Sequence, residues 1–326
     1  MKKWIINKED GVAIFEDVSQ RREGQVKVKM SKVAVSSQDV CHLSTLLREK
    51  AVVPGHSAVA HVSEADEDSG LKLGARVVIS PYVSTSEHGE EVVKTMGVDV
   101  DGLLCDFACV PFENVFVLPD GISDEEALFC EYIAMGNNVF EALDREKGDY
   151  IVIVGASTLG LVLGQMATYY QYVPILVDLD ADRLALAQKW GVSYTLNPTY
   201  DNLERRVEEI TGGRMAEAAI SSGDSVDVNA AMRLVKNHGD VIVAGYATRG
   251  NHAVDASTVL KKQLTIKGVC NGIGEMSSAI NLLANKVVKT DGIFGASANF
   301  DEIPQVVENC VKYPYQYGKI LVNCDD

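Results

Sequence analysis

The sequence predicts an α/β protein with two domains: a β-rich first domain, and a second domain with a doubly wound parallel sheet. The chain has 326 residues, more than one hydrophobic core usually holds. The first third contains short apolar runs that end at proline, glycine or aspartate. From residue 123 onward, strand-like runs alternate with segments of helical periodicity, which is typical of a parallel sheet covered by helices.

In the first third, strands are expected at the alternating valines 26, 28, 33 and 35, and at residues 76–80, 103–110 and 115–118. Residues 84–102 are polar and acidic, so we expect them to form a surface excursion. A helix is expected to begin at Ser123, because this serine can cap it and three acidic residues follow in the first turn. This helix should continue through Ile133 towards Leu143.

The parallel sheet is expected to contain strands at residues 151–154, 175–178, 193–196, 218–221, 241–244 and 264–268. The helices that accompany these strands are expected at residues 159–170, 181–190, 203–210, 227–235 and 277–288. The tail, residues 317–322, should form one more strand, which could return to the first domain.

Composition and charge restrict the partners and the location that we expect. Apolar residues make up 47% and charged residues 23% of the chain, as in ordinary globular enzymes. The net charge is −16, so we expect neither a nucleic-acid nor a membrane partner, because phosphates would be repelled. The sequence shows no apolar run long enough to span a membrane and no signal peptide, and its seven cysteines include no Cys-x-x-Cys pair. These features predict a cytoplasmic protein with reduced thiols.

The most specific motif is a glycine turn between two predicted strands. It reads Gly155-Ala-Ser-Thr-Leu-Gly160, and Asp178 closes the second strand. The free amides of a helix N-terminus can bind a pyrophosphate, and a carboxylate at this spacing can accept a hydrogen bond from the ribose 2′-hydroxyl. Asp178 and the following Leu179 favour NAD over NADP, because the carboxylate would repel a 2′-phosphate. The alternative is an ordinary βαβ crossover.

The residues expected to contact the dinucleotide in this motif are Gly155, Ser157, Thr158, Leu159, Gly160 and Asp178. Ser157 stands where the fingerprint has its middle glycine. Its side chain narrows the backbone's approach to the phosphates, although its hydroxyl could donate to one of them.

Further motifs follow in one order along nearly the whole chain. They are Gly24-Gln-Val-Lys-Val-Lys, Pro54-Gly-His56, Leu73-Gly-Ala-Arg-Val-Val, Asp106-Phe-Ala-Cys-Val-Pro, Leu118-Pro-Asp-Gly-Ile-Ser, Asp182-Arg-Leu-Ala-Leu-Ala, Ser221-Ser-Gly223, Gly239-Asp-Val-Ile-Val-Ala-Gly245 and Leu264-Thr-Ile-Lys-Gly268. In this order the chain resembles the medium-chain dehydrogenase/reductase superfamily, on its zinc alcohol and sorbitol dehydrogenase side. The resemblance implies a GroES-like catalytic domain over residues 1–125, completed by 290–326, and an NAD-binding Rossmann domain over 126–289. It also adds Arg183, Ser222 and Gly245 to the expected cofactor contacts.

The zinc site that this resemblance implies is incomplete. The segment Ala34-Val-Ser-Ser-Gln-Asp-Val-Cys41 aligns with the family's Gly-Ile-Cys-Gly-Thr-Asp-Leu-His. Ser36 therefore replaces the cysteine ligand, while Gln38 and Cys41 replace the two residues that relay protons. Residues 84–102 also lack the four cysteines of the family's structural zinc lobe.

Two ligand positions of the catalytic zinc are retained, since His56 is present and Glu131 matches the last ligand of some family members, but Ser57 replaces the glutamate after the histidine. Two good ligands bind zinc weakly, so we expect no bound metal, unless Cys41 and His42 rebuild a site.

The resemblance and the missing ligands together predict an NAD-dependent oxidoreductase that interconverts a small alcohol or polyol and its ketone or aldehyde without zinc. The expected catalytic residues are His56, Glu131 and Ser36. Glu131 should raise the pKa of His56, so that its imidazolium donates the proton, while Ser36 donates a hydrogen bond. The alternative for His56 is a purely structural histidine.

Two other function classes stay open. One is a zinc-free reductase of conjugated C=C bonds or quinones, although those family branches usually prefer NADPH, against which Asp178 counts. The other is a non-catalytic NAD-binding pseudoenzyme or sensor. In each case we expect a homodimer or homotetramer, joined at sheet edges near Val269 and Ile293–Phe294. The substrate depends on loop residues around 36–46, 82–102 and 270–276.

Overall fold

The computed structural model describes residues 1–7, 11–16, 20–36, 53–87, 89–222, 228–245, 253–312 and 319–324. The chain divides into two compact units. Unit 1 comprises Met1–Glu131, Met276–Ala284 and Thr290–Asp326, and unit 2 comprises Tyr132–Glu275 and Asn285–Lys289. The predicted fold class is confirmed, since unit 1 is built on a largely antiparallel sheet and unit 2 on a parallel one.

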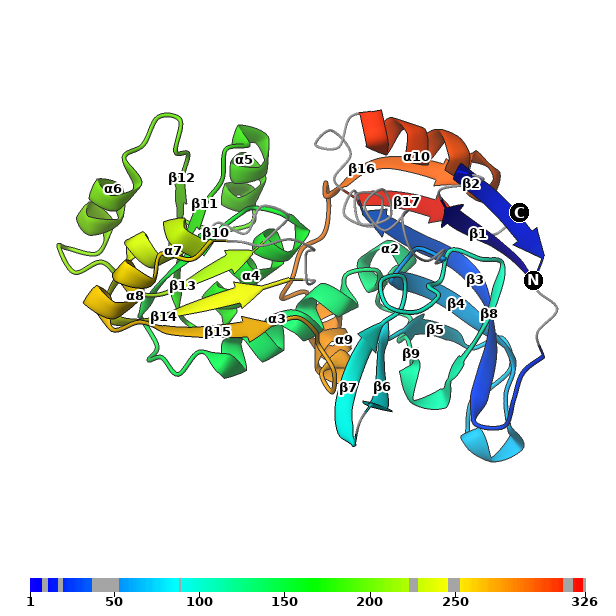
Figure 1. Cartoon of the computed structure of the whole chain (residues 1–326). Helices are drawn as coiled ribbons and strands as arrows, with labels where there is room; N and C mark the ends of the chain where they lie inside the picture. The colour runs from blue at the N-terminus through cyan, green and yellow to red at the C-terminus, as the bar shows by residue number, and fades with distance from the viewer. Residues whose placement is uncertain are drawn as a thin grey trace. The chain divides into compact units, whose positions relative to one another are not determined.

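Unit 1 is built on a seven-stranded sheet in the order β16-β17-β3-β4-β5-β9, with β8 paired to β3 off this path. Its strands are β3 (Gln25–Ser36), β4 (Ser57–Glu64), β5 (Arg76–Ile79), β8 (Phe107–Pro111), β9 (Val115–Val117), β16 (Phe294–Asn299) and β17 (Lys319–Asn323). Strand β17 comes from the end of the chain and pairs antiparallel with β3 (Figure 1). The predicted return of the tail strand to the first domain is therefore confirmed.

Two hairpins accompany this sheet: β1 (Lys2–Asn7) with β2 (Gly11–Glu16), and β6 (Tyr82–Glu87) with β7 (Glu90–Thr95). The second hairpin occupies much of the segment that we expected to form a surface excursion, residues 84–102. Its tight turn includes Gly89, whose φ of 83° lies in the left-handed region that such turns favour. The remaining elements of unit 1 are the 3-10 helices Glu67–Ser69, Phe112–Asn114 and Phe300–Glu302 and the α-helices α2 (Asp124–Ala127), α9 (Met276–Ala284) and α10 (Ile303–Lys312).

The helix expected from Ser123 to Leu143 is interrupted, which corrects the prediction. Ser123 does form a capping box with Glu126, but α2 ends at Ala127 and α3 (Cys130–Ala142) begins three residues later. The amide of Phe129 bonds back to Glu126 rather than to Glu125, and this tighter turn ends the first helix. Leu128 and Phe129 therefore stand between two helices.

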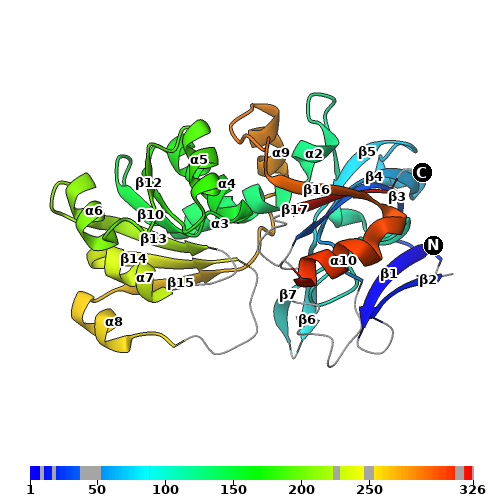
Figure 2. The same cartoon turned by 90° about the horizontal axis from the view of Figure 1, so that it is seen from above.

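Unit 2 contains six parallel strands in the order β12-β11-β10-β13-β14-β15. The strands are β10 (Tyr150–Val154), β11 (Val173–Val177), β12 (Tyr194–Leu196), β13 (Ala216–Ser222), β14 (Val235–Ala244) and β15 (Thr265–Val269). The helices are α4 (Thr158–Tyr169), α5 (Ala181–Lys189), α6 (Leu203–Ile210), α7 (Val228–Leu234) and α8 (Ala256–Lys262). Figure 2 shows α4 and α5 on one face of this sheet and α7 and α8 on the other. The strand order reverses between β10 and β13, which is the switch point where such sheets bind ligands.

The two strands that we expected to join subunits lie in different sheets. Val269 lies on β15 at an edge of the parallel sheet, but Phe294 belongs to β16 in the other sheet, so the two expected contact strands do not share an edge. The cause is that the chain returns to unit 1 at Thr290.

Among the described helices, none combines the length and apolar character needed to cross a membrane.

Candidate active site

The position of His56 is fixed by a tight backbone packing within unit 1. Gly55 has a φ of 87°, and a side-chain carbon on it would lie 2.9 Å from Val33 and 3.2 Å from the amide of Leu104. The amides of Gly102, Leu103 and Leu104 donate to the carbonyls of Val53, Gly55 and Pro54 at 2.7, 2.8 and 2.9 Å. These three bonds explain why the strand expected from residue 103 begins only at Phe107: the preceding residues support the histidine turn instead.

Three ionisable side chains meet in the interior of unit 1. The Nε2 atom of His56 lies 3.2 Å from Oε1 of Glu131, and Nζ of Lys319 lies 3.4 Å from the same oxygen. The exposed fractions of His56, Glu131 and Lys319 are only 2, 2 and 1%. Charged side chains are almost never buried to this extent unless they are paired. This charged cluster, His56–Glu131–Lys319, is the candidate acid–base site.

The carbonyl of Leu128 completes the charged cluster. It accepts hydrogen bonds from Oγ of Ser57 at 2.6 Å and from Nζ of Lys319 at 3.1 Å. It stands in the break between α2 and α3, so the helix interruption directs this carbonyl to side-chain donors. Ser57, which replaces the family's glutamate, therefore serves here as a hydrogen-bond donor.

The described residues around the charged cluster do not fit a zinc ion. No group of three or more His, Cys, Asp or Glu side chains in the described part of the chain could hold a metal. Cys130 adjoins Glu131, and burial, reinforced by the charge of Glu131, raises the pKa of its thiol strongly. Nζ of Lys319 lies 3.4 Å from Oε1 of Glu131, so a dication bound to this carboxylate would be repelled by the ammonium.

Of the three predicted catalytic residues, the structure brings two together. His56 and Glu131 meet, as expected, while Ser36 is the last residue of β3 and pairs in register with Lys319. The side chain of Ser36, together with Gln38, Cys41 and His42, lies outside the described residues. Sequence reasoning missed Lys319, although one signal was present: it opens the apolar run Lys319-Ile-Leu-Val that we predicted to return as a strand.

In unit 2 the glycine turn has no room for side chains. Gly155 has a φ of 103°, and a side-chain carbon on it would lie 1.9 Å from the carbonyl oxygen of Ser222. On Gly160 such a carbon would lie 1.8 Å from the carbonyl oxygen of Gly155. Oγ of Ser222 donates to that same Gly155 oxygen at 3.1 Å. Both glycines are therefore required for α4 to approach β10 and β13.

The N-terminus of α4 offers donors to a ligand. Ser157 caps the helix by accepting from the amide of Gly160 at 3.4 Å. Within the described residues, the amides of Ser157, Thr158 and Leu159 have no hydrogen-bond acceptor. Amides left free in this way suit the negative oxygens of a pyrophosphate, so this site fits a dinucleotide.

Asp178 is held at the end of β11 by the glycine turn itself. Its Oδ2 accepts from the amide of Ala156 at 2.5 Å, and its Oδ1 accepts from the amide of Asp180 at 2.8 Å. Arg183 pairs with Asp180 at 3.4 Å, and Gly245 follows β14 with a φ of 135°. All nine expected cofactor residues belong to unit 2. They lie at or just after the carboxyl ends of β10, β11, β13 and β14, or in the first turns of the helices after β10 and β11.

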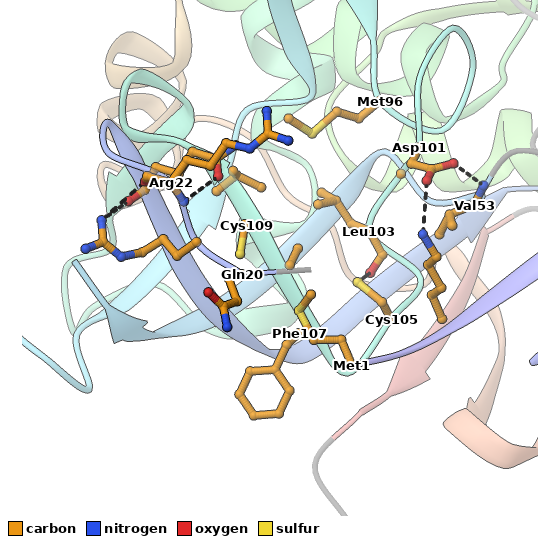
Figure 3. A pocket seen from close by; sticks show the side chains of 16 residues that line it. Met1, Gln20, Arg22, Val53, Met96, Asp101, Leu103, Cys105, Phe107 and Cys109 are labelled. Atoms are coloured by element: carbon orange, nitrogen blue, oxygen red, sulfur yellow. Dashed lines mark hydrogen bonds and ion pairs between the residues drawn. The ribbon is translucent and has the colours of Figure 1, made fainter. Parts of the chain in front are cut away.

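A cavity of about 710 Å³ opens elsewhere in unit 1 (Figure 3). Residues of β1, β3 and β8 and the preceding loops line it, among them Arg22, Asp101, Cys105 and Phe107. Asp101 bridges the amide of Val53 and the ammonium of Lys3, which ties the N-terminal strand to the histidine turn. Among the described residues that line this cavity, none belongs to the charged cluster.

Comparison with known proteins agrees with this architecture. A family model described as an alcohol dehydrogenase GroES-like domain matches residues 22–120, and one described as a zinc-binding dehydrogenase matches residues 158–285. An uncharacterized zinc-type alcohol dehydrogenase-like protein of Haemophilus influenzae is 27% identical over 278 residues, or 82% of this chain and 81% of its own. The sorbitol dehydrogenase of Bacillus subtilis is 21% identical over 316 residues, or 91% and 90%.

Solved structures share the fold. A short chain alcohol dehydrogenase of Escherichia coli CFT073, solved in complex with the cofactor NADH, matches with a TM-score of 0.85 at 19% identity and covers 99% of both chains. The two family models follow each other in the same order as the two sheets. The chain therefore belongs to the medium-chain dehydrogenase/reductase superfamily, as an alcohol dehydrogenase-like oxidoreductase.

Proposed function

We propose that the protein is an NAD(H)-dependent oxidoreductase that interconverts a small alcohol or polyol with its ketone or aldehyde, and that it does so without zinc. The observation that carries this proposal is the buried charged cluster, in which an imidazole and an ammonium lie within 3.4 Å of one carboxylate oxygen and supply acid–base groups. Its relatives include the sorbitol dehydrogenase of Bacillus subtilis, which supports a polyol or a similar alcohol as the substrate class.

The charged cluster would move the hydroxyl proton. During alcohol oxidation, the imidazole of His56 would take the proton that leaves the substrate oxygen at its other ring nitrogen, because Nε2 faces Glu131, and during carbonyl reduction it would return that proton. A carboxylate at 3.2 Å stabilises the imidazolium that forms in between. A bound nicotinamide cofactor would supply the hydride acceptor or donor. Ser36, at the end of β3, is proposed as an additional hydrogen-bond donor to the substrate oxygen.

NAD is favoured over NADP by the setting of Asp178. Two backbone amides, those of Ala156 in the glycine turn and of Asp180, donate to its carboxylate and hold it beside that turn. A 2′-phosphate beside this carboxylate would meet a fixed negative charge. The neighbouring Arg183 pairs with Asp180, so its guanidinium charge is already partly balanced. Gly155, Ser157, Thr158, Leu159, Gly160, Ser222 and Gly245 would complete the proposed contacts.

Self-association into a dimer or tetramer is part of this proposal. Strand β15 lies at the edge of the parallel sheet, and Ile266 on it is 38% exposed. Unpaired strand edges favour pairing with another chain. Light scattering that gives a monomer at micromolar concentration would contradict this part.

Two measurements test the proposed function. The first is metal content by plasma mass spectrometry on protein purified without chelators. The second follows NADH absorbance with alcohols, polyols, enones and quinones as substrates. Turnover of an alcohol by metal-free protein is expected. Stoichiometric zinc would overturn the metal-free mechanism, turnover of enones or quinones alone would indicate a C=C or quinone reductase, and NADH binding without any turnover would indicate a sensor.

A further inference from the structure

We propose that the cavity of unit 1 binds a small monocarboxylate with an apolar body, and that the guanidinium of Arg22 receives its carboxylate group. The cavity measures about 710 Å³, within the range of pockets that hold small molecules. Its described lining lies wholly in unit 1 and includes no residue of the charged cluster or of the expected cofactor site. Such a ligand would therefore be separate from the substrate and from the cofactor.

The cavity has a polar rim and an apolar floor. Arg22 and Gln20 are exposed at its edge, whereas Leu103 and Cys105 are buried and Phe107 is half-buried. Figure 3 shows Arg22 at one end of the cavity and Leu103 and Cys105 at the other. Ligand pockets commonly combine apolar walls with a few polar groups that fix the orientation of the ligand. A molecule with an apolar body and one polar head group fits this arrangement.

Positive charge prevails around the cavity. Among its described lining residues three are cationic and one is acidic: Lys3, Arg21, Arg22 and Asp101. The chain as a whole has a net charge of −16, so this part of its surface is locally reversed in sign. A cleft lined by positive charge attracts anions. The head group of the ligand should therefore be anionic.

Arg22 is the cation that stays available to such a head group. Nζ of Lys3 lies 3.3 Å from Asp101, and Arg21 donates to Asp66 at 2.6 Å. Among the described residues, no acidic side chain pairs with the guanidinium of Arg22, and only its backbone is engaged: its carbonyl accepts from Arg21 at 3.5 Å. A guanidinium presents two parallel N–H donors that match one carboxylate group. A monocarboxylate therefore fits better than a ligand with several charges.

The thiol of Cys109 can report whether the cavity is occupied. Cys109 is half-buried, lines the cavity and lies two residues after Phe107 on β8, so both side chains are on the same face of the strand (Figure 3). A ligand whose body packs against Phe107 would cover this thiol and slow its alkylation. The exposed Cys270 of unit 2 does not line the cavity and should react at an unchanged rate.

The experiment uses the full chain with octanoate as the probe. Isothermal titration calorimetry measures its affinity, and iodoacetamide alkylation followed by peptide mass spectrometry measures the protection of Cys109. Octanoate is expected to bind about tenfold or more tightly than its uncharged analogue octanamide, and Arg22→Gln should weaken octanoate binding by a similar factor. Arg205→Gln is the matched control, because this exposed arginine lies on α6 of unit 2 and does not line the cavity.

Three results would overturn the proposal. They are absence of octanoate binding, equal affinity for octanamide, and octanoate binding that Arg22→Gln leaves undiminished or that leaves a reactive Cys109 unprotected. If Cys109 resists alkylation even without octanoate, the calorimetry of the two arginine variants decides. Arg22→Gln should keep the parent's turnover in the NADH absorbance screen, because Arg22 belongs to neither the charged cluster nor the cofactor site. Failure of this site and failure of the proposed function can thus be told apart.

Discussion

The Nε2 atom of His56 lies 3.2 Å from Oε1 of Glu131, although the two residues come from different elements of unit 1. His56 stands in the turn before β4, which the glycines at 55 and 102 allow to pack closely, and Glu131 stands in the first turn of α3. Both side chains are buried, so a proton shared by them is shielded from solvent. The pair therefore has the geometry of an acid–base couple.

The replacement His56→Asn removes the proton acceptor and keeps a polar side chain of similar size. We expect kcat to fall by about a hundredfold or more, because general acid–base groups contribute roughly that much. Steady-state NADH absorbance with the best substrate of the screen measures the effect. The control is His61→Asn. His61 lies on β4, the strand that follows His56, but outside the charged cluster, so this variant should keep the parent rate. A near-normal rate of His56→Asn would make the histidine structural.

The replacement Asp178→Asn removes the negative charge at the end of β11 and keeps the side chain's size. We expect the Kd of NADH to rise about tenfold or more, since a hydrogen bond to a charged group contributes roughly 1.5–3 kcal/mol. The ratio of NADH to NADPH affinity should fall at the same time. Fluorescence titration with both cofactors measures these changes.

The control for this prediction is Asp182→Asn, because Asp182 lies exposed in the first turn of α5 and should affect neither titration. If the parent protein binds NADPH as tightly as NADH, the proposal that Asp178 selects NAD over NADP is wrong.

Local patterns predicted unit 2 better than unit 1, and the reason is physical. Each strand of the parallel sheet is a short buried run followed by a helix, so periodicity alone shows it, and β10, β11 and β12 lie within two residues of their expected ranges. Strand β14 begins six residues earlier than expected, where the more polar sequence Lys236-Asn-His gives no strand signal.

Unit 1 depends on pairings between distant segments, which no local pattern contains. Strands β1 and β2 form an unexpected hairpin, and the backbone before Phe107 supports the histidine turn instead of forming a strand. Lys319 escaped sequence reasoning because lysine is usually exposed, and only its pairing with Ser36 and its contact with Glu131 show that it is buried. The charged cluster could thus be predicted for two of its three members.

The replacement Gly160→Ala tests the close approach of α4 to the glycine turn. The added carbon would lie 1.8 Å from the backbone oxygen of Gly155, and no change of rotamer relieves a backbone contact. We expect a loss of about 3 kcal/mol in the free energy of unfolding, which lowers Tm by about 4 °C in a chain of 326 residues. Differential scanning calorimetry measures it. Gly268→Ala on β15, where an added carbon meets open space, should leave Tm nearly unchanged; equal shifts in both variants would contradict the close approach.

Cys105 and Cys130 are buried thiols, and Cys130 adjoins Glu131 in the chain. Burial is the main cause that raises the pKa of both Cys105 and Cys130, and the charge of Glu131 raises that of Cys130 further. A raised pKa lowers the thiolate fraction at any given pH, so both residues should stay unmodified by iodoacetamide at pH 8 while the exposed Cys270 is alkylated. Peptide mass spectrometry gives the extent at each site, and the protein unfolded in guanidinium chloride, where all three react, is the control. Alkylation of Cys130 at the rate of Cys270 would show that the start of α3 opens to solvent, and Glu131 could then not remain the dry partner of His56 that the proposed mechanism requires.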